Sequence, residues 1–248
     1  MTFALAAFAF APGLAVGSFL NVVAARLPLG RSVATPRSAC MHCGTEIRAR
    51  DNVPVISYLV LRGRCHSCRA PIGLRYPAVE LSTALLAAGS VIAFGPTLHA
   101  LAAGLFCAAL VCITATDVEH RIVPNRVVLP AAVAVLALQL AWHPTIQWPA
   151  AGLGAALFLF VVALAYPRGM GMGDVKLALL IGFGVGRAVP VAIFLAMLTA
   201  LVPSIVLLAR HGVAARKMKI PFAPFLALGG VVALFAGNPL LDWYLRFL

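Results

Sequence analysis

Two of the four aspartates in this chain stand at the edges of strongly apolar segments. Asp117 follows one apolar run and Asp174 precedes another. A carboxylate at the edge of a bilayer is costly to place and usually has a function. Two such carboxylates brought together share a proton and activate a water molecule, which is aspartic-protease chemistry. The pair is therefore the first candidate for a catalytic site.

The residues around Asp174 fit a site at which backbones approach closely. Asp174 follows the alternating glycines Gly169, Gly171 and Gly173, and Lys176 comes two positions later. Glycines allow close backbone approach and left-handed backbone conformations near a helix start. The simpler interpretation makes Asp174 a helix N-cap. Lys176 could change the electrostatic environment of Asp174 or contact a substrate. Alternatively, it is present only because inner loops of membrane proteins are rich in Lys and Arg.

Asp117 also has a simpler interpretation. It opens a polar run in which Pro124 and Asn125 predict a turn. An aspartate at a helix end can lie in the headgroup region, stabilised here by Arg121. Asp117 and Asp174 together, on one side of one membrane, are more specific than either residue alone.

The composition predicts a membrane protein. Of 248 residues, 62% are hydrophobic and 10% are charged, and the mean hydropathy is +1.01. Soluble domains carry about 25% charged residues. We therefore expect an all-α polytopic membrane protein with about eight transmembrane helices. The expected segments are 3–25, 78–95, 98–116, 127–142, 149–166, 175–189, 190–209 and 222–241.

The positive charges predict the orientation. All Lys and Arg residues except Arg187 and Arg246 fall in loops on one side of these segments. The positive-inside rule then places the N-terminus and the C-terminus outside, and both Asp117 and Asp174 at the cytoplasmic face. Topology thus explains the net charge of +12, and nucleic acid is not expected as a partner.

The longest loop, 26–77, carries two CxxC pairs, Cys40 with Cys43 and Cys65 with Cys68. Each pair can supply two adjacent corners of a tetrahedron, so the four thiolates predict a closed, structural zinc site. Such a site would fold a loop with little core of its own. Disulfides or free thiols are the alternatives, and the reducing cytoplasm disfavours disulfides.

Several separated blocks stand out along the chain, namely 17–23, 26–28, the two CxxC pairs, 52–54, 61–65, 75–80, 117–125 and the GxGDxK-like 171–176. In this order they resemble the bacterial type IV prepilin peptidases, and the resemblance covers nearly the whole chain. Members of the family often have a second acid two residues after the first catalytic Asp, and here that acid is Glu119. Many members have Asp where this chain has Asn125. Neither feature removes Asp117 or Asp174.

The resemblance implies a bifunctional enzyme of the bacterial inner membrane. Such enzymes cleave the basic leader of prepilins or pseudopilins after a glycine on the cytoplasmic face. Many then methylate the new N-terminus with S-adenosylmethionine. By resemblance Asp117 and Asp174 are catalytic, and Gly171, Gly173 and Lys176 support the motif.

Glu80 has two interpretations. It would serve the methyl-transfer or substrate site, or it is a carboxylate that pairs with the loop. The expected domains are a first transmembrane helix at 1–25, the four-cysteine loop at 26–77 and a bundle with the peptidase site at 78–248. The sequence predicts no oligomeric state.

Two other classes of protein remain open at this point. A transporter or proton channel also uses paired membrane carboxylates, but it places them deep within the spans. A non-enzymatic scaffold would use its zinc loop to bind a partner, and would keep its function after replacement of Asp117 or Asp174.

Overall fold

The computed structural model describes residues 2–166, 170–212 and 220–247. Over these residues the protein is all-helical and contains no β-sheet. The α-helices are α1 (Thr2–Arg26), α2 (Ile56–Val60), α3 (Arg75–Phe94), α4 (Leu98–His120), α5 (Asn125–Trp142), α6 (Gln147–Ala165), α7 (Met172–Val185), α8 (Val189–His211) and α9 (Ala223–Leu245). Short 3₁₀ turns occupy Leu27–Leu29, Ala49–Asp51 and Gly186–Ala188.

Seven helical stretches among the described residues are long and apolar enough to cross a membrane. The stretch Met172–His211 has 40 residues, about 60 Å of helix and twice the thickness of a bilayer core. It contains α7 and α8, which the turn Gly186–Ala188 separates. This stretch corresponds to two of the eight segments expected from the sequence.

Contacts with α9 show that the chain reverses between α7 and α8. Three close contacts define the directions: Ile181 against Gly230, Ala188 against Gly237, and Ala192 against Gly229. From α7 to Ala188 the contacts move toward the C-terminal end of α9, and in α8 they move back toward its N-terminal end. Gly186 at the reversal has φ +58°, a conformation that favours glycine. The 40-residue stretch thus folds back on itself as a hairpin.

Several helices extend past the apolar runs that predicted them. Segment 98–116 continues as α4 to His120, so Asp117 lies inside the helix. Segment 175–189 begins as α7 at Met172, so Asp174 lies in its first turn. The end of α4 is set by Arg121, whose φ is +55° and whose N–H donates to the Asp117 carbonyl at 2.8 Å. Local capping geometry, rather than hydropathy, fixes these boundaries.

Two glycines of α1 allow it to pack tightly against α3. A Cβ at Gly13 would lie 2.7 Å from the Ala84 Cα, and one at Gly17 would lie 2.6 Å from the Glu80 Cα. These glycines form a GxxxG pair, which permits close helix approach in a bilayer. Because α1 and α3 are antiparallel, Asn21 of α1 reaches the first turn of α3, where its side chain donates to the Tyr76 carbonyl.

Gly17→Ala is expected to destabilise the protein by about 1–3 kcal/mol, because the added methyl meets the backbone of α3, which cannot yield. Gly104→Ala is the matched control, since a Cβ there has no neighbour within 4 Å. A helical Gly→Ala change in open space gains about 0.5–1 kcal/mol. Thermal unfolding in detergent measures both; equal melting temperatures for the two variants would contradict the packing.

Helix α7 lies at the centre of the main core. Its side chains Leu177, Leu180 and Ile181 are fully buried. They belong to one cluster with apolar side chains of α4, α5, α6 and α9. These neighbours include Phe106, Leu110, Val128, Leu159 and Leu226. The core therefore fixes the start of α7 relative to the end of α4 and the starts of α5 and α9.

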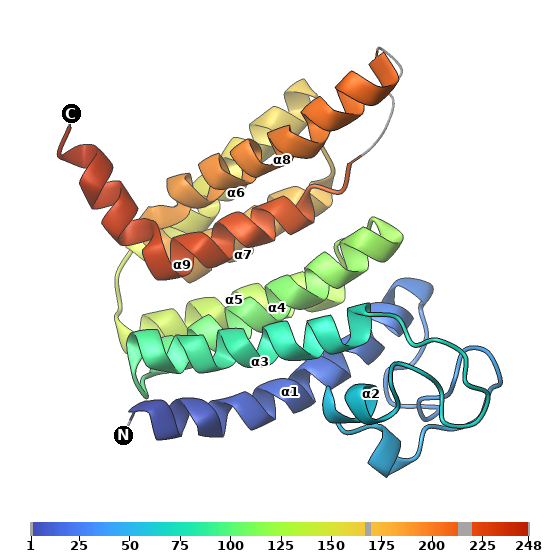
Figure 1. Ribbon diagram of the computed structural model, residues 1–248. Coiled ribbons are helices and arrows are strands. Elements are labelled where there is room, and N and C mark those ends of the chain that lie inside the picture. The colour runs from blue at the N-terminus through green and yellow to red at the C-terminus, as the bar shows by residue number, and fades with distance from the viewer. Residues whose placement is uncertain (1, 167–169, 213–219, 248) are drawn as a thin grey trace.

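The two ends of the bundle differ in what they carry. Figure 1 shows the loop between α1 and α3 at one end, together with the end of α4 and the start of α9. Both chain termini lie at the opposite end (Figure 1). The loop, Asp117 and Asp174 thus share one end of the molecule.

Candidate active site and metal centre

Asp117 and Asp174 line the same pocket. It has a volume of about 270 Å³ and lies where α4, α5 and α7 meet. The two residues are far apart in the sequence, and the fold brings both carboxylates to one cavity. The remaining lining residues are Arg121, Ile122, Val123, Asn125, Gly171, Gly173 and Lys176.

Asp117 is held by two helices. It lies in the last turn of α4, where it is buried at 7% exposure. Its Oδ2 accepts a hydrogen bond of 3.3 Å from the backbone N–H of Ala223, the first residue of α9. A helix N-terminus favours a nearby negative charge. The start of α9 is therefore part of the site, although sequence reasoning did not single out this residue.

Asp174 closes the first turn of α7. Its Oδ2 accepts from the Gly171 N–H at 3.3 Å, and its own N–H donates to the Gly171 carbonyl at 3.1 Å. Gly171 is therefore the N-cap and Asp174 stands at the third helical position. The simpler expectation that Asp174 is itself the N-cap was wrong, because the helix starts earlier at Met172. Gly169 lies outside the described residues.

Gly173 has no room for a side chain. A Cβ on Gly173 would lie 2.9 Å from the Cβ of Val123, in the connection between α4 and α5. Both residues line the pocket. Gly173 therefore allows α7 to start directly against the residues that follow Asp117.

Gly173→Ala is expected to lower peptidase activity about 10- to 100-fold, because the methyl group displaces Val123 or α7, and a shift of about 1 Å between reacting groups has a cost of this order. Gly154→Ala is the control, since a Cβ there has open space. Initial cleavage rates at equal protein levels measure the effect. A Gly173→Ala variant as active as the control would show that close approach is not needed.

Lys176 bridges two walls of the pocket. Its Nζ donates a hydrogen bond of 2.8 Å to Oδ1 of Asn125, the first residue of α5. The Asn125 amide oxygen thus accepts from Lys176. The contact ties α5 to α7 beside Asp174.

Glu80 lies away from this pocket. It is buried in α3 at 8% exposure, and its Oε2 accepts from the Val55 N–H at 2.7 Å. Val55 has φ +61°, which is unusual for a β-branched residue. This contact matches the interpretation in which Glu80 is a carboxylate that pairs with the loop. Strained backbone of this kind often accompanies functional sites.

The four loop cysteines form a cluster that fits a metal ion. The Sγ atoms of Cys40, Cys43, Cys65 and Cys68 all lie within 4.8 Å of one another. Those of Cys40 and Cys68 are 3.7 Å apart. A tetrahedral zinc with Zn–S bonds of about 2.3 Å requires sulfurs about 3.8 Å apart. The donor set and its spacing therefore suit zinc.

The two CxxC pairs lie on equivalent turns. In each pair the backbone N–H of the first cysteine donates to the carbonyl of the fifth residue after it. Cys40 N–H donates to the Thr45 carbonyl at 2.9 Å, and Cys65 N–H donates to the Ala70 carbonyl at 2.8 Å. Hydrogen bonds with Thr45 lower the pKa of the Cys43 thiol to about 6. The pKa of Cys68 is raised to about 11, because a backbone hydrogen bond with Ala70 is outweighed by burial and the neighbouring thiols. The lowered pKa, which favours the metal-binding thiolate form, therefore does not extend to all four thiols.

Comparisons with known proteins agree with this geometry. The model of the bacterial peptidase A24 N-terminal domain matches residues 12–94, and that of the type IV leader peptidase family matches residues 104–205. No solved structure matches the chain.

Curated relatives from three bacteria match over most of their length, and each is named prepilin leader peptidase/N-methyltransferase. The protein from Burkholderia pseudomallei (strain 1026b) is 39% identical, over 94% of this chain and 86% of its own. That from Bacillus subtilis (strain 168) is 35% identical, over 94% and 95%. That from Pseudomonas aeruginosa is 35% identical, over 95% and 91%. This chain therefore belongs to the type IV leader peptidase family.

Proposed function

We propose that this protein is a membrane aspartic endopeptidase that cleaves the leader peptide of type IV prepilins and prepilin-like secretion proteins. The observation that carries the proposal is the pocket shared by Asp117 and Asp174. The names of the relatives support the substrate class. The inner membrane is the proposed location, in keeping with the apolar helices and the family.

The two carboxylates divide the hydrolytic chemistry between them. One is ionised and takes a proton from the attacking water, while the other is protonated and donates a hydrogen bond to the scissile carbonyl. Their titrations are coupled, so the pair and not either residue has apparent pKa values. Backbone N–H groups of Ala223 and Gly171 orient the two side chains.

The site faces the cytoplasm in this proposal, and both termini lie outside. The support is the distribution of Lys and Arg along the chain. Arg187 and Arg246 are the two exceptions to this distribution, and Arg187 is paired with Asp242 at 3.0 Å. Several inner-loop cations, namely Arg168, Arg216, Lys217 and Lys219, lie outside the described residues.

Two other functions fit the geometry less well. A transporter that relays protons needs acids deep within the spans, whereas Asp117 and Asp174 lie in the terminal turns of α4 and α7. A scaffold would need only the loop, and would leave the pocket of the two carboxylates without a role.

We further propose that the protein methylates the N-terminus that cleavage exposes, as the names of its relatives suggest. S-adenosylmethionine would supply the methyl group for transfer to the free amine. The residues that fit this group best lie where α1, α3 and the loop meet. Glu80 offers a buried carboxylate, and Oδ1 of buried Asn21 has no hydrogen-bond partner within the described part of the chain.

Glu80→Gln is expected to lower methylation at least about tenfold, because the neutral amide weakens both the Val55 contact and any cation bound nearby. Cleavage should stay within about threefold of wild type, since Glu80 does not line the peptidase pocket. Glu46→Gln, in the same loop as Val55, is the control. Loss of cleavage together with methylation would contradict a separate role for Glu80.

The proposed function is tested with purified protein in lipid vesicles, a synthetic prepilin and S-adenosylmethionine. Intact-mass analysis should show loss of the leader, followed by gain of one methylene by the product. Cleavage without the mass gain would support the proposed peptidase activity and contradict the proposed methyltransferase activity. An unprocessed prepilin, with a family relative active in the same assay, would contradict the peptidase.

A further inference from the structure

The short helix α2 carries its apolar side chains on its outer face. Ile56, Leu59 and Val60 have the i, i+3, i+4 spacing of one helix face, and they are 58%, 67% and 74% exposed. Ser57, on the other face, is buried at 8% exposure. An amphipathic helix on a water-soluble surface shows the reverse pattern.

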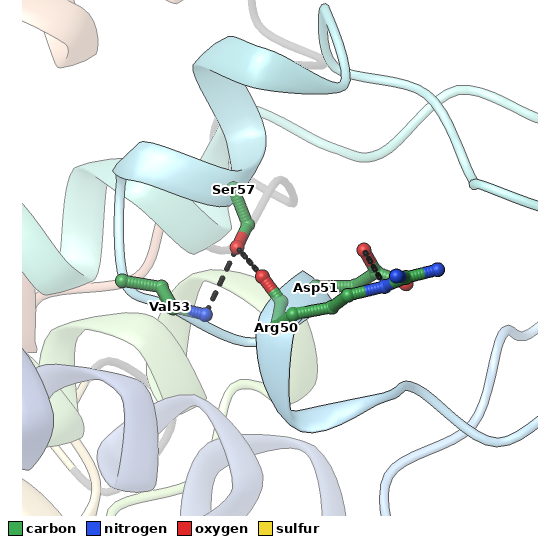
Figure 2. Close-up of polar contacts among 4 residues, drawn as sticks. All are labelled: Arg50, Asp51, Val53 and Ser57. Carbon is green, nitrogen blue, oxygen red and sulfur yellow. Dashed lines mark hydrogen bonds and ion pairs between the residues drawn. The ribbon is translucent and has the colours of Figure 1, made fainter.

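Hydrogen bonds hold α2 in this orientation. Figure 2 shows the Ser57 hydroxyl between two backbone groups of the preceding turn. Its Oγ accepts from Val53 N–H at 2.9 Å and donates to the Arg50 carbonyl at 3.0 Å. Rotating the apolar face inward would break both bonds and leave the Val53 N–H and the Arg50 carbonyl without this partner.

A second contact sets the level of α2 along the bundle. The Val55 N–H, which directly precedes α2, bonds to Glu80 in the second turn of α3. Glu80 lies about 7.5 Å along the helix axis from Arg75, where α3 begins. Because α3 spans the membrane, α2 starts beside the first turns of a transmembrane helix, where acyl chains give way to headgroups.

Charge and neighbouring surface favour lipid as the occupant of this face. Arg62 and Arg64, both exposed, lie two and four residues after the end of α2, and cations near the membrane surface are attracted to anionic headgroups. The start of α3 also exposes apolar side chains, with Leu74 at 73% and Leu81 at 41%. Exposed apolar side chains are therefore present both on α2 and around the start of the transmembrane helix α3.

We propose that α2 is an interfacial helix that docks the four-cysteine loop onto the bilayer. Ile56, Leu59 and Val60 enter the boundary between acyl chains and headgroups, as amphipathic surface helices do. Arg62 and Arg64 lie among the anionic headgroups. The metal centre, whose second CxxC pair begins shortly after Val60 at Cys65, is thereby held at the membrane surface. This docking does not depend on the proposed function.

Photo-crosslinking of the full chain tests the docking. p-Benzoylphenylalanine is placed at position 59 in protein reconstituted into vesicles of phosphatidylethanolamine and phosphatidylglycerol. Position 60 provides a second probe in case the first impairs folding. Leu85, exposed on α3, is the positive control, and Met41, which is 89% exposed in the loop, is the negative control. Mass spectrometry then identifies what each probe has captured.

We expect phospholipid adducts from positions 59 and 85, and none from position 41. The absence of a lipid adduct at both 59 and 60, while 85 gives one, would overturn the proposal. Adducts at 59 with a second copy of the chain, or with added prepilin, in place of lipid would overturn it as well. They would assign the face to self-association or to substrate.

Discussion

Replacing either Asp117 or Asp174 with asparagine is expected to lower the rate of prepilin cleavage about 10²- to 10⁴-fold, the contribution of a positioned general acid or base. Asparagine keeps an oxygen that can accept the hydrogen bond from the Ala223 or Gly171 N–H. The change therefore removes the ionisable proton and leaves the local fold in place. Gel shift and initial rates in vesicles measure the loss.

The chain supplies two matched controls for this experiment. Asp51 pairs with Arg50 in the loop, and Asp242 pairs with Arg187 at the opposite end of the bundle. Asp51→Asn and Asp242→Asn should leave cleavage within about threefold of wild type, as surface substitutions usually do. Full activity of the Asp117 and Asp174 variants would rule out the carboxylate pair and favour the scaffold.

Replacing Cys65 with serine is expected to abolish methylation and to leave cleavage within about threefold of wild type. The loop has almost no core of its own, since Ser57 is the one buried residue of segment 30–74. A four-cysteine zinc site can supply about 10 kcal/mol or more of folding free energy. Loss of one thiolate should therefore unfold the loop, while no residue of the loop lines the peptidase pocket.

Bound zinc and the two activities are measured on the same preparation. One zinc per chain is expected for the wild type and for the control Ser67→Ala, which changes an exposed residue of the same turn. Much less zinc is expected for Cys65→Ser. Full zinc occupancy in the Cys65→Ser variant, or unchanged methylation without zinc, would contradict a structural metal.

The sequence predicted the helical membrane fold because long apolar runs have few alternatives in a bilayer. It also predicted that the four loop cysteines belong together, and their Sγ atoms form one cluster. The GxxxG pair of α1 is a pattern that permits close packing, and Gly13 and Gly17 lie against α3. In each case a pattern of residue types corresponds directly to one physical constraint.

Other parts of the site carry no such pattern. The Ala223 contact to Asp117 is made by a backbone N–H, which any residue except proline would provide. The need for Gly173 depends on Val123, which is about 50 positions earlier in the chain and is brought near by tertiary packing alone. The partner of Glu80 is also a backbone group, at Val55. Such contacts arise only from the folded arrangement of the chain.

The protein is expected to carry two separate sites, a carboxylate pair in the bundle and a methyl-transfer site at the four-cysteine loop. The most direct measurement is the intact mass of products from two substrates, a prepilin and a pre-cleaved pilin peptide. We predict that Asp174→Asn methylates the pre-cleaved peptide but does not cleave the prepilin, and that Cys65→Ser does the reverse. Loss of both activities in either variant, with the helical bundle still folded, would contradict the separation of the two sites.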